Sequence, residues 1–330
     1  MRAVAAIFGS KTRRWLPGVL ISVVALAVVL QLATWQDIEL AFTAVRPLNL
    51  AAAVALTLIS LSLRAQAWRV LLDRKATFKQ AFWIICEGYL LNNIFPLRAG
   101  ELGRAVFMGR ATGLGTMHTL STIVIERAGD LAIAAGVQFG TLPLALAMDW
   151  ARPLAITTIA LVLLGLVALY LMARYNRQAQ ELAYHVGGRF SLVNRHLLPR
   201  FTALLTGLAV LTRPSQFLIS LLLIALGWVS WVAIYYVMLL TIAPTAPFWW
   251  GIFVNAVLAL GVALPSAPAA LGVFEAAIVG ALAVLGVSAG AVGFAFVMHL
   301  FQFVITAILG LSGLVQEHRS LSNLMRELQS

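Results

Sequence analysis

The chain has 330 residues, of which 62% are hydrophobic and 11% are charged, and its formal net charge is +11. This apolar content exceeds what one soluble core needs, so it argues against a soluble enzyme or a nucleic-acid-binding protein and predicts an all-α, polytopic integral membrane protein. Cys86 is the only cysteine, which excludes a disulfide within the chain. The expected organisation is a single transmembrane domain over residues 1–330.

The first two spans are placed by basic residues at their ends. The apolar run 17–35 follows four basic residues and lacks a small-residue cleavage site, which indicates an uncleaved span with the N-terminus in the cytoplasm. The run 48–63 returns the chain to the cytoplasm. There, Arg64 and Arg69 with Trp68 are expected to anchor it at the inner interface.

The next three apolar stretches cannot all cross the membrane. They are 81–96, 119–148 and 153–172, and they lie between Lys79 and Arg174, which are both expected in the cytoplasm. An even number of crossings is therefore required. The stretch 81–96 is short and interrupted by polar residues, so we expect a re-entrant hairpin that enters from the cytoplasmic side. Because a broken backbone at membrane depth needs protein or water around it, such a hairpin indicates an internal site.

The tip of this hairpin carries residues suited to a lipid head group. Arginine presents a rigid fork of donors that matches a phosphate, and glycine allows a ligand to approach the backbone closely. The alternative is that Arg98 and Glu101 only pair with each other at the membrane surface while Arg104 extends to the interface. The candidate residues in this segment are Asn92, Asn93, Pro96, Arg98, Gly100, Glu101 and Arg104.

The apolar stretch 119–148 contains three charged residues, Glu126, Arg127 and Asp130. A charged side chain inside a bilayer costs roughly 2.5 to 3.5 kcal/mol, so all three are expected to face the protein interior and to have partners. Arg127 can reach Asp130 on the same helix, which leaves one carboxylate over. Two interpretations stay open: a structural buried network that includes the hairpin arginines, and a site where the remaining carboxylate or Arg127 binds a lipid head group or a proton.

The second half predicts a similar arrangement. The segment 174–213 carries six arginines against a single acid, so it is expected in the cytoplasm, either as an amphipathic stretch on the membrane surface or as a solvated loop. The run 218–240 then crosses outward, and the run 289–315 is one long span. Between them, 248–264 and 271–285 are two short arms. If the C-terminus is cytoplasmic, these arms form a second hairpin that enters from outside.

One hairpin from each side is what an inverted-topology duplication produces, with the substrate site where the two broken segments meet. The repeated halves would be residues 1–173 and 214–315, joined by the basic segment 174–213. The whole chain would then contain about six full crossings plus two re-entrant hairpins.

The second hairpin supplies three further candidates, Pro268, Gly272 and Glu275. Prolines interrupt the helix there, glycine loosens its restart, and a carboxylate follows within an apolar segment. His299 and Gln302 on the last span either face Glu275 or are ordinary core residues.

Several catalytic signatures are missing from the sequence. It contains no Walker-type phosphate loop, no zinc-like cluster of histidines and cysteines, and no convincing Ser/His/Asp set. We therefore expect no cofactor, no metal and no ATP-driven pumping within this chain.

Three motifs resemble a known family. The segments 93–104, 126–130 and 268–275 are similar, in this order, to the membrane region of bacterial lysylphosphatidylglycerol synthases and to related membrane proteins, including ones linked to hopanoid and glycolipid pathways. The family usually has Pro-Gly-Gly where this chain has Pro268-Ala269-Ala270, so the flexibility of the backbone at that tip is expected to differ. The resemblance implies a stand-alone lipid flippase domain. Lysyl transfer is not expected, since it belongs to a soluble domain not found here.

The leading hypothesis is thus an ATP-independent lipid translocase or lipid carrier of the bacterial inner membrane, with both termini in the cytoplasm. Its partner would be a membrane lipid with an anionic head group, either a phospholipid, a glycolipid or a polyprenyl- or hopanoid-type lipid. It would bind no nucleic acid, and it would act as a homo-oligomer or with a lipid-biosynthesis protein. The alternative is a membrane-embedded enzyme or accessory subunit of lipid or glycolipid biosynthesis, in which a carboxylate pair performs acid/base chemistry.

Overall fold

The structure, a computed structural model, describes residues 22–31, 35–95, 99–145, 151–187, 197–263 and 266–317. These residues form helices and no strand, so the prediction of an all-α membrane protein is confirmed. After an apolar helix over Ser22–Gln31, the elements are α3 (Trp35–Ala44), α4 (Pro47–Leu71), α5 (Phe78–Ile94), α6 (Ala99–Thr112), α7 (Thr116–Ala145), α8 (Ala151–Arg174), α9 (Asn176–Gly187), α10 (Leu198–Leu208), η2 (Ala209–Thr212), α11 (Pro214–Leu239), α12 (Phe248–Val262), η3 (Pro268–Ala270), α13 (Val273–Val284) and α14 (Ala291–Gln316).

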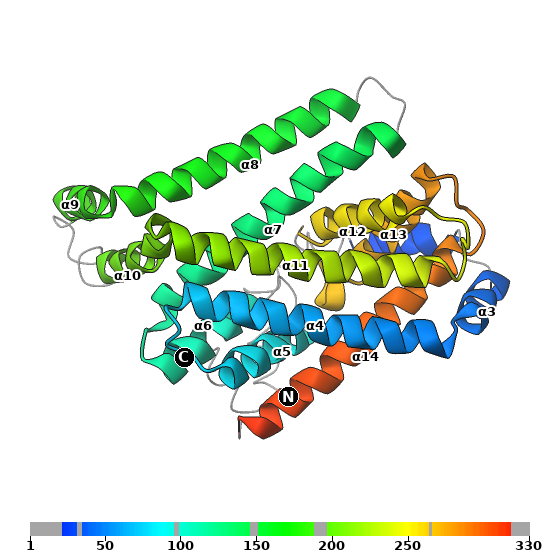
Figure 1. Ribbon diagram of the computed structural model, residues 1–330, viewed down its shortest axis with the longest axis horizontal. Helices are drawn as coiled ribbons and strands as arrows, with labels where there is room; N and C mark the ends of the chain where they lie inside the picture. Colours follow the sequence, from blue (N-terminus) through cyan, green and yellow to red (C-terminus); the bar gives the residue numbers. More distant parts are fainter. Residues whose placement is uncertain are drawn as a thin grey trace, which may run out of the picture.

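The long helices correspond to the predicted crossings. Among the described residues, α4, α11 and α14 are long and apolar enough to span a bilayer. The helices α7 and α8 have 30 and 24 residues, which is also sufficient length. The predicted cytoplasmic termini lie outside the described residues. The chain changes direction after α8. Figure 1 shows α8 in the plane of the view and the following helix, α9, almost end-on.

The helices α4 and α11 form an antiparallel pair along the long axis of the molecule (Figure 1). The side-chain amide of Asn49, early in α4, donates to the carbonyl oxygen of Val237, late in α11, at 3.0 Å. The Ser60 hydroxyl donates to the carbonyl oxygen of Gly227 at 3.2 Å. Residue numbers thus rise in one helix as they fall in the other, which fixes the opposite directions of the two helices.

Each helix of this pair is followed by a helical hairpin. A short turn leads from α4 into α5, which packs against α6, and another leads from α11 into α12, which packs against α13. Because α4 and α11 are antiparallel, the two hairpins begin at opposite ends of the molecule. The first hairpin packs on α14 through α5, and the second packs on α7 through α12.

The first hairpin is held tight by glycines. A Cβ atom at Gly100 would lie 1.9 Å from the carbonyl oxygen of Gly88, so the two arms touch backbone to backbone. The backbone N–H of Gly100 donates to Oδ1 of Asn92 at 2.9 Å, which ties the arms together near the tip. The glycine-rich segment 99–104 is therefore the start of a helix, whereas its composition would also suit an open loop.

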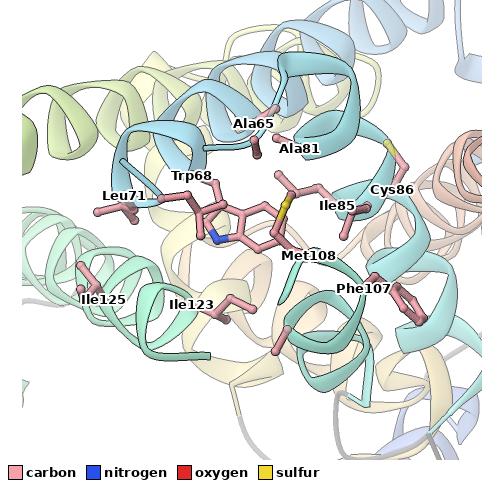
Figure 2. Packing of buried hydrophobic residues seen from close by; sticks show 14 of the residues in the cluster. Ala65, Trp68, Leu71, Ala81, Ile85, Cys86, Phe107, Met108, Ile123 and Ile125 are labelled. Carbon is pink, nitrogen blue, oxygen red and sulfur yellow. The ribbon is translucent and has the colours of Figure 1, made fainter. Parts of the chain in front are cut away.

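An apolar core packs against this hairpin. Figure 2 shows Trp68 of α4 at its centre, surrounded by Ile85 of α5, Met108 of α6 and Ile123 of α7. All four side chains are almost completely buried. The core fixes the relative positions of the helices that carry the charged residues described below.

The second hairpin has a strained tip. Ala269 and Ala270 both have a φ of 56°, in the left-handed region that favours glycine, and Gly272 has a φ of 82°. A Cβ atom at Gly272 would lie 2.2 Å from the carbonyl oxygen of Ser22, so the first helix rests directly on this glycine. The alanines therefore adopt the conformation that glycine would adopt without strain.

Substitutions at this tip should have opposite effects. Ala269→Gly and Ala270→Gly should each stabilise the protein by up to about 1 kcal/mol, because a left-handed alanine costs more than the added freedom of an unfolded glycine. Gly272→Ala should lower the thermal unfolding temperature, because it adds strain and a clash with Ser22. Thermal unfolding in mild detergent measures all three, and an equal loss of stability in the glycine and alanine variants would contradict the strain.

Candidate functional site

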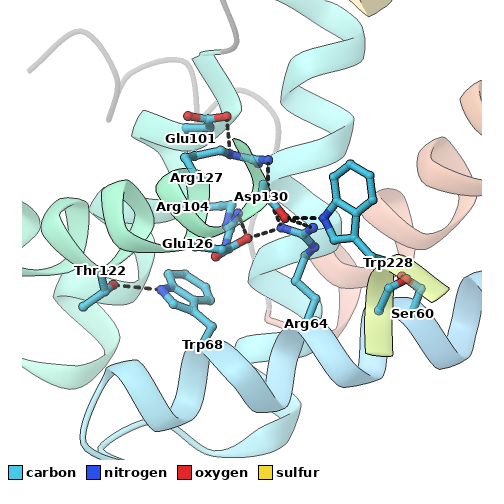
Figure 3. Close-up of polar contacts among 11 residues, drawn as sticks. Ser60, Arg64, Trp68, Glu101, Arg104, Thr122, Glu126, Arg127, Asp130 and Trp228 are labelled. Carbon is cyan, nitrogen blue, oxygen red and sulfur yellow. Dashed lines mark hydrogen bonds and ion pairs between the residues drawn. The ribbon is translucent and has the colours of Figure 1, made fainter. Parts of the chain in front are cut away.

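A network of charged side chains lies where the first hairpin meets α4 and α7 (Figure 3). We call it the ion-pair network. Its formal charges cancel, since it joins three arginines to three carboxylates. Its members are Arg64, Glu101, Arg104, Glu126, Arg127 and Asp130.

Glu126 is the most deeply buried member. Its side chain is 1% exposed and lies between the guanidinium groups of Arg64 and Arg104, with 2.7 Å from Arg104 Nη2 to Glu126 Oε2. The Arg104 guanidinium also stacks over the Trp68 ring, 4.3 Å from its centroid. The indole N–H of Trp68 donates to Thr122 Oγ1 at 3.0 Å, which holds the ring in place. Glu126 therefore connects α4, α6 and α7 through one carboxylate.

Asp130 accepts hydrogen bonds from three side chains. The two terminal nitrogens of Arg64 each lie 3.0 Å from one of its oxygens, in the paired geometry that is strongest for arginine and carboxylate. Arg127 Nη1 also lies 3.0 Å from Asp130, one helical turn away. The indole N–H of Trp228 on α11 donates to Asp130 Oδ1 at 3.0 Å. Asp130 thus connects the network to α11.

The pair of Glu101 and Arg127 is the more accessible part of the network. Arg127 Nε lies 2.8 Å from Glu101 Oε1, and both side chains are 22% exposed, compared with 1% for Glu126. This pair joins the first turn of α6 to the middle of α7. It is one of the contacts between the start of α6 and the rest of the molecule.

A cavity of about 500 Å³ lies beside this pair, between the two hairpins. This volume is in the range of small-molecule sites. The charged residues in its wall are Arg64, Glu101, Arg127 and Asp130. Aromatic and amide side chains complete the polar lining: Tyr89 from the first hairpin, Trp228, Trp231 and Tyr235 from α11, Asn255 from the second hairpin and Gln302 from α14.

The candidate residues of the first hairpin and of α7 separate into four groups. Glu101, with Arg127 and Asp130 of α7, lines the cavity, whereas Arg104 and Glu126 lie behind its wall. Asn92 and Gly100 hold the two arms together, and Asn93 donates to Thr306 Oγ1 on α14 at 2.9 Å. Pro96 and Arg98 lie outside the described residues.

The candidates of the second hairpin are not in the cavity wall. Glu275 is buried, and its Oε2 accepts from the backbone N–H of Gly272 at 2.8 Å. Its Oε1 lies 2.5 Å from His299 Nδ1, so His299 does face this carboxylate. Pro268 begins the short helix η3 before Gly272. These residues shape the tip of the hairpin, and Asn255 is the polar residue that this hairpin presents to the cavity.

One expectation from the sequence, and one of the alternatives that it left open, are wrong. Arg64 does not anchor α4 at the membrane interface, because α4 continues to Leu71 and its position places Arg64 against Glu126 and Asp130. Arg104 does not extend to the interface, because its side chain is only 3% exposed and paired with Glu126. The missed signal for Arg64 is that no helix-breaking residue follows it before Asp73.

The comparisons with known proteins point to one family. The family model for the lysylphosphatidylglycerol synthase TM region matches residues 15–310 of the chain. No curated protein and no solved structure matches the chain.

Proposed function

Because this chain belongs to the family of the lysylphosphatidylglycerol synthase transmembrane region, we propose that it moves a lipid across the inner membrane without ATP. Membership supports a lipid-related membrane function. The finer proposal is a translocase or carrier whose substrate is a phospholipid with an anionic head group, a glycolipid, or a polyprenyl- or hopanoid-type lipid.

The observation that carries this proposal is the cavity with four charged residues in its wall, which lies between two hairpins that begin at opposite ends of the molecule. A lipid head group must exchange its water for other polar partners while it crosses the bilayer. The cavity wall offers such partners at the meeting point of the hairpins, which is where transporters with broken helices bind their substrates. The acyl chains would stay in the surrounding lipid.

The charged groups of the wall have distinct roles in this proposal. Arg127 is the arginine that contacts a phosphate, because it lines the cavity and its side chain is 22% exposed, compared with 11% for Arg64, the other arginine of the wall. Arg64, Arg104 and Glu126 hold the first hairpin against α4 and α7. This division makes the buried part of the network structural and the exposed part functional.

We also propose that the chain contains two inverted repeats. In this proposal α4, α5 and α6 correspond to α11, α12 and α13. Supporting features are the antiparallel packing of α4 on α11 and the hairpin that follows each of them. The basic segment 174–213 would join the repeats.

Two asparagines on hairpin arms provide a matched test. Asn255→Leu should slow lipid exchange between leaflets about tenfold, because a head-group hydrogen bond of about 1–3 kcal/mol is lost from the cavity wall. Asn93→Leu should leave the rate close to that of the wild type, because Asn93 bonds to α14 outside the cavity. The measurement is dithionite quenching of fluorescent phosphatidylglycerol in proteoliposomes. Equal rates for both variants would show that the cavity does not take part in lipid exchange.

Lipid transport and the enzymatic alternative predict different results in a cell without this protein. If the protein moves lipid, the cell should retain every lipid species and should show an altered distribution between leaflets. Mass spectrometry of total lipids, combined with leaflet labelling, measures both. A missing lipid species would indicate an enzyme or an accessory subunit of synthesis.

A further inference from the structure

The cavity extends beyond the ion-pair network along α11. Where α11 meets the network, the indole N–H of Trp228 donates to Asp130 Oδ1 at 3.0 Å (Figure 3). Trp231 and Tyr235 follow on the same face of the helix and also line the cavity. The distance along the helix from Trp228 to Tyr235 is about 10 Å. The cavity wall therefore continues over an aromatic surface that leads away from the charged side chains.

The second hairpin places Asn255 beside this aromatic surface. A Cβ atom at Gly251 of α12 would lie 2.8 Å from the Cβ atom of Tyr236. Eight residues later, Ala259 packs in one cluster with Trp228. Helix α12 is thus antiparallel to α11. Asn255 is halfway between these two contacts, so it lies about 6 Å beyond Trp228 along α11.

Asn255 is a buried amide for which the described residues provide no hydrogen-bond partner. It is only 7% exposed, and it lines the cavity. Nearly all buried polar groups in proteins have a partner, because the water that they lose on burial must be replaced. An unpaired amide in a cavity wall therefore points to a ligand that bonds to it.

Gln302 of α14 supplies a second amide to this part of the wall. Its Oε1 accepts from the Tyr235 hydroxyl at 3.4 Å, whereas its Nε2 finds no acceptor within the described ranges. The helices α11 and α12 carry no acidic or basic residue, and α14 carries only His299, which is bonded to Glu275. The three helices thus offer amides and a hydroxyl to a ligand, and no free charge.

The chemistry of these groups selects among the parts of a lipid head group. An amide both donates and accepts hydrogen bonds, so its full satisfaction requires a ligand that does the same. A phosphate diester only accepts, and an ammonium group only donates and would need a counter-charge. An acyl chain does neither. A hydroxyl group donates and accepts without charge, so it is the group that fits this part of the wall.

We propose that Asn255 and Gln302 form a subsite for hydroxyl groups, so that the cavity selects a lipid whose phosphate carries a polyol. This inference rests on the function proposed above, in which Arg127 contacts the phosphate. The phosphate then lies at the charged part of the wall, and the polyol extends along α11 to the two amides. Selection comes from the amides, because they are left unpaired when the head group has no hydroxyl.

Two lipids that differ only in hydroxyl groups test the subsite. Phosphatidylglycerol and phosphatidylpropanol have the same charge and the same number of head-group carbons, but phosphatidylpropanol lacks both free hydroxyls. Each carries the same fluorescent acyl chain, and its exchange in proteoliposomes is corrected for exchange in liposomes without protein. The wild type should move phosphatidylglycerol about tenfold faster than phosphatidylpropanol.

The ratio of the two rates is the readout for the variants. It should fall below about twofold in Asn255→Leu and in Gln302→Leu, because each removes an amide from the subsite. Asn93→Leu is the matched control, since Asn93 bonds to Thr306 outside the cavity, and it should keep the wild-type ratio. Because both lipids are measured on the same protein, a variant that folds in lower yield still gives a valid ratio.

Thermal unfolding in mild detergent tests binding without transport. Added phosphatidylglycerol should raise the unfolding temperature of the wild type more than phosphatidylpropanol does, since a tighter ligand stabilises the folded state more. This difference should disappear in Asn255→Leu and persist in Asn93→Leu. Equal shifts by the two lipids in the wild type would overturn the subsite.

The two measurements separate the subsite from the proposed function. If an active wild type moves both lipids at the same rate, or if its preference survives in both Asn255→Leu and Gln302→Leu, the subsite is wrong and translocation stands. If the wild type moves neither lipid, the proposed function fails, while the unfolding temperatures still decide whether the amides bind hydroxyl groups.

Discussion

Glu126→Gln should destabilise the protein by about 3–5 kcal/mol, because it leaves the buried Arg104 without a counter-charge and removes one of the two carboxylates that Arg64 contacts. Arg104→Met alone should be costly for the opposite reason, since Glu126 then keeps only Arg64 and the network carries a net negative charge. Thermal unfolding in mild detergent measures both losses. The predicted loss of stability comes from uncompensated charge and not from lost side-chain volume.

The double variant Glu126→Gln with Arg104→Met tests that cause. The remaining network of Arg64, Arg127, Glu101 and Asp130 is again neutral, and Asp130 keeps its paired bonds to Arg64. The double variant should therefore recover most of the stability that each single variant loses. Additive losses would show that packing, and not charge balance, is the main contribution.

An exposed ion pair provides the control for these variants. Arg177 and Glu181 on α9 are one helical turn apart with side chains that are 90% and 65% exposed. Arg177→Met should have no measurable effect on stability, because solvent screens the pair. If Arg177→Met lost as much stability as Arg104→Met, burial would not determine how much an ion pair contributes to stability.

Gly100→Ala should both destabilise the protein and slow lipid exchange. The added Cβ atom would lie 1.9 Å from the backbone oxygen of Gly88, and neither backbone can move aside without separating α5 from α6. Overpacking of this kind costs about 1–3 kcal/mol. Separation of the arms would also displace Glu101, the next residue, from Arg127.

Gly136→Ala on α7 is the matched control. It also replaces a helical glycine by alanine, but no atom lies within 4 Å of the added Cβ. The substitution should raise stability by about 0.5–1 kcal/mol through helix propensity alone. Thermal unfolding and the proteoliposome assay measure both variants, and equal behaviour of the two glycines would contradict the close approach at Gly100.

The architecture could be predicted from the sequence because it depends on simple patterns. The apolar runs located the long helices, and the prolines, asparagines and glycines located the two breaks. The charge of the loops predicted a helical hairpin in the first half, and a cytoplasmic C-terminus would require one in the second half; the structure has a helical hairpin in each place. The pairing of Arg127 with Asp130 also followed from their spacing on one helix.

The partners of the site could not be predicted in the same way. Arg64 and Glu126 are 62 residues apart, so only the packing of α4 against α7 brings them together. Asn255 and Gln302 come from helices that meet the first hairpin only in the folded protein. An arginine near the end of an apolar run has the same local sequence whether it lies at the interface or turns inward.

The distance in sequence between Arg64 and Glu126 has a consequence for assembly. Arg64 is synthesised 62 residues before its buried partner, which at 5–20 residues per second is roughly 3 to 12 s. During this interval the guanidinium must reach a membrane surface or water, because it cannot stay alone in the bilayer. The arginine therefore spends its first seconds at the interface and moves inward when α7 arrives with its carboxylates. Docking of α7 is then the step that commits the first half of the nascent chain to its final depth.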